Sequence, residues 1–344
     1  MSRKRIGIAM SGGVDSTACA IMLQKDYSVQ GFFMHLAQPD FQAQQERVQV
    51  IADHLGISLT IIDLQRQFAE KVLAYFSSTY FDGLTPNPCL ICNREIKFGL
   101  FLEAILAAGM DGMATGHYVR IIEREGIFHL HKGLDPLKDQ SYFLSRLGQA
   151  QLSRLIFPLG ERNKAEIYPF VEEQGFTGFA GLESQDVCFL ANESVGDFLE
   201  KSYPESFADG PIVTRDGREI GRHNGLFRYT IGQRRGLGIA DSTPWYVVRL
   251  EPQTNQVVVG KEDELLQQRV DIGDLHWLAG APPEDGTRHE ARLRSTHRGA
   301  RASFSLSGNG QAVLNFDEPQ RAVTPGQFAV LYQEDEVLGS GVIL

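Results

Sequence analysis

Six residues near the start of the chain, 11–16 with the sequence SGGVDS, constrain the fold more than any other stretch. They follow the apolar run 6–10 and lead directly into the apolar segment 17–23, an order that predicts a strand, a tight turn and a helix. Two glycines let backbone N–H groups approach an anion, the serine hydroxyls add donors, and the helix adds the positive end of its dipole. The stretch predicts a phosphate-binding loop, although a glycine pair at such a place also occurs as a simple tight turn.

The loop differs from the P-loop of many nucleotide hydrolases, because GxxxxGK[ST] requires a lysine beside the final hydroxyl and none stands here. The pattern SGGxDS instead resembles the loop of the ATP-pyrophosphatase superfamily. That resemblance implies an enzyme that adenylates a carbonyl oxygen and releases pyrophosphate.

Length and composition exclude several classes of protein. At 344 residues the chain predicts two or three domains, and its 42% hydrophobic and 10% aromatic content excludes wholesale disorder. No apolar run could span a bilayer and no signal peptide precedes the first strand, so we expect a soluble cytoplasmic protein with no membrane partner. Four cysteines are too few for a disulfide scaffold and suit a reducing compartment.

The net charge of -10 argues against a generic nucleic-acid binder, because such binding comes mainly from neutralised phosphates. Two local clusters are nevertheless basic: Arg234 with Arg235, and Arg292, Arg294, His297, Arg298 and Arg301. Each cluster can be read as a phosphate-facing strip or as solvated arginines on a strand, and charge alone leaves both open.

In the first part of the chain, apolar runs typical of buried strands alternate with helical spacing. The predicted strands are 29–36, 58–64 and 112–115, and the predicted helices are 41–55, 66–80 and about 94–108. This alternation predicts a parallel sheet covered on both faces. Ligands bind at the carboxyl ends of such strands, where residues 11–16 would lie.

Two cysteines, Cys89 and Cys92, follow the rigid segment Thr85-Pro86-Asn87-Pro88. We expect this loop to deliver both thiols at the start of a helix, where the dipole lowers the pKa of a thiol. They are therefore candidate reactive cysteines. Cys19 lies in an apolar helical pattern and is predicted to be buried, whereas local sequence leaves the role of Cys188 open.

The character of the sequence changes from about residue 211, where short alternating apolar runs are broken by Gly, Pro and Asn. These runs predict two small β-barrel-type domains, with a loop at 280–286 within or between them. The predicted fold is α/β, a parallel-sheet nucleotide-binding domain over 1–203 followed by a small β linking domain over 204–262 and a C-terminal β-barrel over 263–344.

The motifs together closely resemble tRNA-specific 2-thiouridylases, which belong to the ATP-pyrophosphatase (adenine nucleotide alpha hydrolase-like) superfamily. The resemblance runs nearly end to end. It rests on SGGVDS at 11–16, TPNP at 85–88, CNREIKF at 92–98, ATGHY at 114–118, GLDP at 133–136, KDQSYFL at 138–144, Ser184-Gln185, Cys188-Phe189, YTIGQRRGLG at 229–238, PWYVV at 244–248 and FDEPQRAVTPGQ at 316–327.

The resemblance implies roles for particular residues. Positions matching the family's ATP contacts are Ala9, Met10, Ser11, Gly12, Gly13, Val14, Asp15, Ser16, Met34 and Gly116. Positions matching its tRNA contacts are Asn87, Pro88 and Cys89 at the target base, and His117, Lys138, Asp139, Gln140, Arg294, Ser295 and Gln327 elsewhere, with the barrels gripping the tRNA. Cys92 matches the catalytic nucleophile and Cys188 the persulfide carrier.

The implied reaction is 2-thiolation of the wobble uridine in tRNAs for Lys, Glu and Gln. ATP with Mg²⁺ adenylates the C2 oxygen, and sulfur from a persulfide on Cys188 replaces it, leaving a Cys92–Cys188 disulfide to be reduced. A sulfur-donor protein (a persulfide relay or a cysteine desulfurase) or inorganic sulfide would supply the sulfur. A mobile loop is expected to bring the distant Cys188 to Cys92.

Two positions depart from the family pattern. Where its best-known branch has an aspartate as general base, this chain has Cys89, which cannot be carried over as that base. Either Cys89 is a bystander or substitute base on the persulfide route, or Cys89, Cys92 and Cys188 together ligate a [4Fe-4S] cluster whose open iron carries hydrosulfide. Ser295 replaces a tyrosine, which puts its tRNA contact in doubt.

Other readings of the same residues have different consequences. A different adenylating enzyme, such as a 4-thiouridine synthase or an amide-forming synthetase, would also use the loop, although the thiols argue against amide formation. A non-catalytic tRNA-binding protein would be expected to have a damaged loop or to lack Cys92, and neither is the case.

Overall fold

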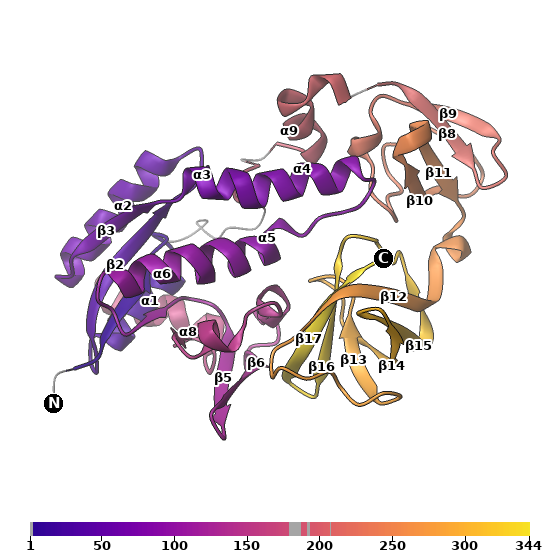
Figure 1. Cartoon of the computed structure of the whole chain (residues 1–344). Helices are drawn as coiled ribbons and strands as arrows, with labels where there is room; N and C mark the ends of the chain where they lie inside the picture. Colours follow the sequence, from indigo (N-terminus) through magenta and orange to yellow (C-terminus); the bar gives the residue numbers. More distant parts are fainter. Residues whose placement is uncertain (1–2, 179–186, 191–192, 207) are drawn as a thin grey trace.

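The computed structural model of the chain describes residues 3–178, 187–190, 193–206 and 208–344. These residues form a parallel sheet between helices, then a small antiparallel-rich sheet, then a barrel (Figure 1). The predicted α/β architecture followed by small β units is confirmed. The predicted divisions at residues 203 and 262 stay predictions.

The first sheet is parallel throughout, in the order β3-β2-β1-β4-β7. Its strands are β1 (Arg5–Ala9), β2 (Ser28–His35), β3 (Leu59–Asp63), β4 (Gly112–Ala114) and β7 (Leu155–Ile156). Both faces of its central strands are covered, which explains their continuous apolar runs: Ile8, Phe32 and Met113 are 0% exposed.

Helices cover the sheet in two layers. One layer consists of α1 (Val14–Leu23), α2 (Phe41–Leu55) and α8 (Lys164–Glu173). The other consists of two long helices with π-helical middle stretches: α3 (Gln65–Phe68), η1 (Ala69–Leu73) and α4 (Ala74–Phe81), then α5 (Pro88–Ile91), η2 (Cys92–Leu100) and α6 (Phe101–Ala107).

The second long helix begins at Pro88, so the predicted start near Arg94 was wrong. Proline suits the first helical position because its missing N–H would have no partner there. The Asn87 side chain accepts a hydrogen bond from the Leu90 N–H at 3.2 Å and caps the helix. Cys89 and Cys92 consequently lie inside the helix rather than in a loop ahead of it.

A hairpin that was not predicted follows β4. Its strands β5 (Val119–Arg124) and β6 (Ile127–Lys132) are joined by Glu125 and Gly126, both with positive φ. Strand β6 pairs with β17 of the C-terminal barrel, which attaches the nucleotide-binding part to the barrel (Figure 1).

The middle sheet has the order β10-β11-β8-β9. Its strands are β8 (Gly210–Thr214), β9 (Glu219–His223), β10 (Tyr246–Glu251) and β11 (Gln256–Gly260). Helix α9 (Val195–Ser202) precedes it, and the Ser194 hydroxyl accepts a hydrogen bond from the Asp197 N–H at 3.1 Å as its N-terminal cap.

The C-terminal barrel has the strand order β12-β15-β14-β13-β16-β17, and the pairing of β12 with β17 closes it. Its strands are β12 (Leu266–Trp277), β13 (Arg288–Arg292), β14 (Ala300–Gly308), β15 (Gln311–Arg321), β16 (Phe328–Gln333) and β17 (Glu336–Ile343). Residues 280–286 connect β12 to β13, so the predicted loop lies within this unit.

Short helical turns complete the connections: η3 (Ser141–Leu144), α7 (Gln149–Leu152), η4 (Pro204–Ser206), η5 (Leu226–Arg228), η6 (Pro252–Thr254) and η7 (Glu262–Leu265). In the described part of the chain, every helix is too short or too polar to cross a membrane.

Gly326 of the barrel packs against Leu84 and Thr85, in the segment before Pro88. A side chain at position 326 should disturb this contact. Gly326 has a φ of +89°, and a Cβ atom would lie 2.9 Å from the Thr85 N and O atoms. We expect Gly326→Ala to destabilise the protein by about 2–4 kcal/mol. Gly286→Ala is the control, because Gly286 has a φ of +79° but open space around it; it should cost only about 1–2 kcal/mol. Equal thermal unfolding midpoints for the two variants would contradict this expectation.

Candidate functional site

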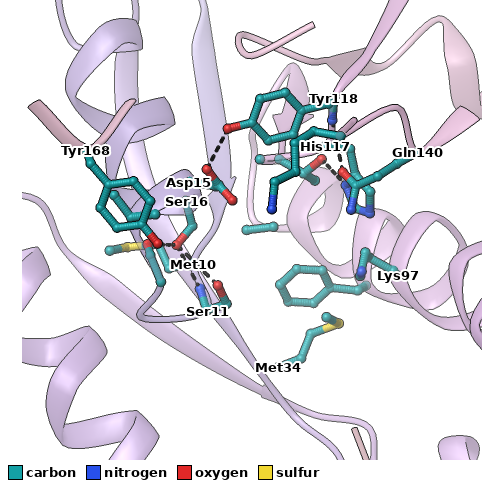
Figure 2. A pocket seen from close by; sticks show the side chains of 17 residues that line it. Met10, Ser11, Asp15, Ser16, Met34, Lys97, His117, Tyr118, Gln140 and Tyr168 are labelled. Carbon is teal, nitrogen blue, oxygen red and sulfur yellow. Dashed lines mark hydrogen bonds between the residues drawn. The ribbon is translucent and has the colours of Figure 1, made fainter. Parts of the chain in front are cut away.

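A cavity of about 340 Å³ opens at the carboxyl ends of β1, β2 and β4 (Figure 2). Its lining includes every predicted ATP-contacting residue except Gly12, and also His117, Lys138 and Gln140, which were predicted to contact tRNA. Sequence reasoning missed five lining residues: Lys97, Phe101, Thr115, Tyr118 and Tyr168.

The loop at 11–16 is held in a fixed shape. The Ser16 hydroxyl accepts a hydrogen bond from the Ser11 N–H at 3.2 Å and donates one to the Gly13 carbonyl at 3.0 Å. Gly12 has a φ of +79°, a conformation that favours glycine, and Gly13 precedes the first residue of α1. The N-terminal N–H groups of α1 are therefore available to an anion in the cavity.

Gly116 approaches this loop from β4. A Cβ atom on Gly116 would lie 2.8 Å from the Asp15 Cβ and 3.0 Å from the Asp15 carbonyl carbon. Only glycine fits so close to the loop without moving it. This close approach explains why the sequence has glycine at this point of the cavity wall.

Asp15 is the most strongly bonded side chain of the loop. Lys164 on α8 lies with its Nζ atom 2.8 Å from each of the Asp15 carboxylate oxygens, and the Tyr118 hydroxyl donates to Asp15 Oδ1 at 2.8 Å. Lys164 is 7% exposed. The loop itself contains no lysine. Lys164 supplies one from a helix that lies 149 residues further along the chain. Burial and the nearby Asp15 charge raise the pKa of Tyr118, so its hydroxyl stays protonated.

The thiols of Cys89 and Cys92 are half-buried, and Cys188 is exposed. Burial raises the pKa of Cys92 to about 12, a shift that the Lys97 ammonium partly opposes. Burial and the neighbouring Cys188 thiolate also raise the pKa of Cys89. The predicted lowering of these pKa values was wrong, because desolvation of the thiols outweighs the dipole of the helix that begins at Pro88.

The charge of a Cys188 thiolate contributes to the raised pKa of both Cys89 and Cys92. The movement of a loop that brings Cys188 to Cys92 stays a prediction. Phe189 anchors its neighbour Cys188, with ring centroids 5.1 Å from Phe76 and 5.3 Å from Phe198. Although Cys188 has exposed surface, desolvation by the protein packed around it raises its pKa, and Lys97 again opposes the shift. Ser184 and Gln185, which contributed to the family resemblance, lie outside the described residues.

Lys97 is the cation common to the cavity and the thiols. It lines the cavity (Figure 2). Its charge also partly offsets the rise in the pKa of Cys89, Cys92 and Cys188. In an α-helix, residues five apart lie about 140° from each other around the axis. The π-helical stretch η2 has wider turns, with i→i+5 hydrogen bonds, and brings Lys97 back towards the face of Cys92.

His117 is a neutral group in this site. Burial, and then the Lys97 charge, hold the pKa of His117 well below its ordinary value. Its Nδ1 atom lies 2.7 Å from the Thr115 hydroxyl. The imidazole can therefore accept or donate a hydrogen bond but carries no charge at neutral pH.

The barrel meets the cysteine helix through Gln327. Its Nε2 atom donates to the carbonyls of Thr85 at 3.1 Å and Pro86 at 2.8 Å, and its Oε1 atom accepts from Asn87 Nδ2 at 3.4 Å. The structure thus brings together four of the residues predicted to contact tRNA: Asn87, Pro88, Cys89 and Gln327.

Three predicted tRNA contacts, Asp139, Arg294 and Ser295, lie outside both this group and the cavity lining. Arg294 and Ser295 follow β13 in a turn on the barrel, and Arg294 donates a 3.5 Å hydrogen bond to the Arg321 carbonyl. Arg292, one of the basic cluster, points inward and pairs with Asp139 at 2.9 Å. It is therefore neither a solvated arginine nor a free phosphate-facing side chain.

The chain matches known families along its length. Residues 4–192 match the tRNA methyl transferase HUP domain, 196–261 the tRNA methyl transferase PRC-barrel domain and 267–343 the aminomethyltransferase beta-barrel domain. A tRNA-specific 2-thiouridylase MnmA from Desulfotalea psychrophila is 54% identical over 344 residues, with 100% of both chains covered. Proteins of the same name from Chloroflexus aurantiacus and Syntrophotalea carbinolica are 42% and 41% identical, covering 98% and 99% of this chain and 97% and 98% of their own.

The effect of Lys97 on the thiols can be measured by alkylation. Because the pKa of Cys92 is about 12, its reaction with iodoacetamide should keep accelerating up to pH 10 without a plateau. Lys97→Met should slow the reaction at pH 8 by roughly threefold or more, because it removes the charge that favours the thiolate. Lys71→Met is the matched control, since Lys71 pairs with Glu95 at 3.1 Å and is not among the groups that shift the thiols. Tandem mass spectrometry distinguishes Cys92 from Cys89, and equal rates in the two variants would contradict the role of Lys97.

Proposed function

Because the chain belongs to the family of tRNA-specific 2-thiouridylases, we propose that it uses ATP to replace the C2 oxygen of the wobble uridine with sulfur in tRNAs for Lys, Glu and Gln. One observation carries the proposal: Lys97 lines the cavity of the phosphate-binding loop, and its charge also opposes the rise in the pKa of three thiols. The description of the family that matches residues 4–192 refers to a methyl transferase. The side chains at this site include thiols, which suit sulfur chemistry.

ATP binds with its phosphates on the loop at 11–16 in this proposal. The N–H groups at the start of α1 and the serine hydroxyls hold the phosphates, and the apolar side chains of Met34 and Phe101 offer a surface for the adenine ring. Among the described residues lining the cavity, Asp15 is the one carboxylate, and it is already bonded to Lys164. Mg²⁺ would therefore be held chiefly by the nucleotide phosphates, whose charge it neutralises.

The first step transfers AMP to the C2 oxygen of uridine. The oxygen attacks the α-phosphorus, the α–β bond breaks and pyrophosphate leaves, which converts a poor leaving group into a good one. Lys97 lies where it can stabilise charge on the α-phosphate and, later, on departing AMP. Cys89 is a poor base for this step, because its raised pKa keeps it as a thiol.

The second step moves sulfur through two cysteines. The Cys92 thiolate attacks Sγ of a Cys188 persulfide, a Cys92–Cys188 disulfide forms, and the terminal sulfur leaves as hydrosulfide. Hydrosulfide adds to the activated C2 and AMP departs with the former C2 oxygen. A thiol reductant then returns an electron pair to the disulfide and restores both cysteines.

The donor of sulfur reaches Cys188 from outside. Cys188 is exposed, so a persulfide on a relay protein or a cysteine desulfurase can transfer its terminal sulfur to it. Inorganic sulfide, the alternative source, cannot form a persulfide on a thiol without an oxidant and would instead add directly to the activated C2. Reduced thiols and a tRNA substrate agree with the cytoplasmic location expected from the sequence.

A [4Fe-4S] cluster on Cys89, Cys92 and Cys188 does not fit this arrangement. Within the described ranges, no three His, Cys, Asp or Glu side chains are arranged to hold a metal ion. We therefore place the persulfide route first.

The decisive assay uses unmodified tRNA, ATP, Mg²⁺ and a persulfide donor, a cysteine desulfurase with cysteine, with nucleoside mass spectrometry as readout. We expect 2-thiouridine together with AMP and pyrophosphate. Formation of 4-thiouridine, or pyrophosphate release without any thionucleoside, would redirect the proposal to another substrate.

Anaerobic purification tests the choice of route. Iron-free, colourless protein with full thiolation activity is expected on the persulfide route. Iron and sulfide in stoichiometric amounts, lost together with activity in Cys89→Ser, would show that the cluster route is the correct one.

Cys92→Ser should abolish thiolation, because serine cannot attack the persulfide, and it should leave tRNA affinity within about twofold. Cys19→Ala is the control; Cys19 is 0% exposed in α1, so its loss should affect stability but not the reaction. Filter binding measures tRNA affinity and mass spectrometry the product. Retained thiolation in Cys92→Ser would remove Cys92 from the mechanism.

A further inference from the structure

Asp139 is fully engaged within the protein, although the family resemblance placed it among the tRNA contacts. Its carboxylate accepts hydrogen bonds from the Gly133 N–H at 3.3 Å, the Ser141 N–H at 3.0 Å, the Ser141 hydroxyl at 3.0 Å and Arg292 Nη1 at 2.9 Å. An ionised carboxylate has about four acceptor positions. Its side chain is 4% exposed, so no acceptor remains for RNA.

Arg292 comes from the barrel. It ends β13, its side chain is 17% exposed, and its guanidinium lies 4.8 Å from the centre of the Tyr332 ring. A buried charge pair of this kind is costly to break from one side, because the remaining charge has no partner. The Arg292–Asp139 pair thus joins the barrel to the segment that follows the β5–β6 hairpin.

The residues on either side of Asp139 line the nucleotide cavity. Lys138 and Gln140 both belong to its wall. Two hydrogen bonds hold Gln140 on the backbone of Tyr118. The side-chain Oε1 of Gln140 accepts from the Tyr118 N–H at 3.0 Å, and the backbone N–H of Gln140 donates to the Tyr118 carbonyl at 3.2 Å. Figure 2 shows Gln140 beside His117 and Tyr118 at the edge of the cavity.

Tyr118 in turn bonds the phosphate-binding loop through Asp15, at 2.8 Å. Direct contacts therefore run without a gap from the barrel to the loop, through Arg292, Asp139, Gln140, Tyr118 and Asp15. Other ion pairs between the barrel and the hairpin, such as that of Arg124 with Glu336 at 3.2 Å, involve hairpin residues that do not line the cavity.

We propose that Arg292 and Asp139 are positioning residues of the nucleotide site, so that the C-terminal barrel shapes the ATP pocket in addition to any contact it makes with tRNA. The proposal rests on the assignment of the cavity to ATP. It reassigns Asp139 from RNA contact to support of Lys138 and Gln140.

The test measures binding of α,β-methylene ATP with Mg²⁺ to the full-length protein by equilibrium dialysis, without tRNA. Arg292→Gln and Asp139→Asn should each raise the Kd about tenfold, which lies within the usual range of coupling between linked sites. The double variant should be no worse than either single one, because the two residues act as a pair. Arg292→Lys, which keeps the charge, should recover part of the affinity.

Arg124→Ala is the matched control, because it removes an exposed ion pair between the same two units and should leave the Kd unchanged. The alkylation rate of Cys92 should be the same in all variants, which separates a change in the pocket from loss of the fold. Unchanged nucleotide affinity in Arg292→Gln, with or without weakened tRNA binding, would overturn the inference. If the wild-type protein itself does not bind the nucleotide, the proposed function fails and the inference with it.

Discussion

The ion pair between Asp15 and Lys164 is the interaction on which the site depends. It joins the phosphate-binding loop to α8, and the Tyr118 hydroxyl joins the same carboxylate to the segment after β4. Taking a carboxylate and an ammonium out of water is expensive, and only close contacts to both oxygens compensate. This pair therefore fixes the loop against two other parts of the chain before any nucleotide arrives.

Lys97 connects this loop to the thiols. Desolvation keeps Cys92 as a thiol at neutral pH, with a pKa of about 12, and the lysine is the nearby charge that favours its thiolate. A site of this kind suits a reaction in two stages. A cysteine that stays a thiol at neutral pH is less prone to unproductive oxidation than a thiolate. The π-helical turn of η2 is what lets a residue five positions after Cys92 serve both the thiol and the cavity.

Much of the first domain followed from pattern. The apolar runs of β1, β2 and β4, and the helical spacing of α2, led to a parallel sheet, and the glycines at 12 and 13 led to a phosphate site at its edge. The start of the cysteine helix was misplaced because proline was read as part of a rigid loop, whereas at the first helical position it begins the helix. The pKa values of the thiols were predicted in the wrong direction, because the short segment around Cys89 and Cys92 does not show how far the fold removes these thiols from water.

The sequence by itself determined the loop, the thiols and the succession of strands and helices, because these depend on residues close together in the chain. Only the tertiary structure decided which distant side chains complete the site. Lys164 and Tyr118 reach Asp15, and Arg292 reaches Asp139, across separations of 149, 103 and 153 residues. Such contacts form when packing of the sheet, the hairpin and the barrel buries charges that must then find partners, and no local pattern specifies which partner that will be.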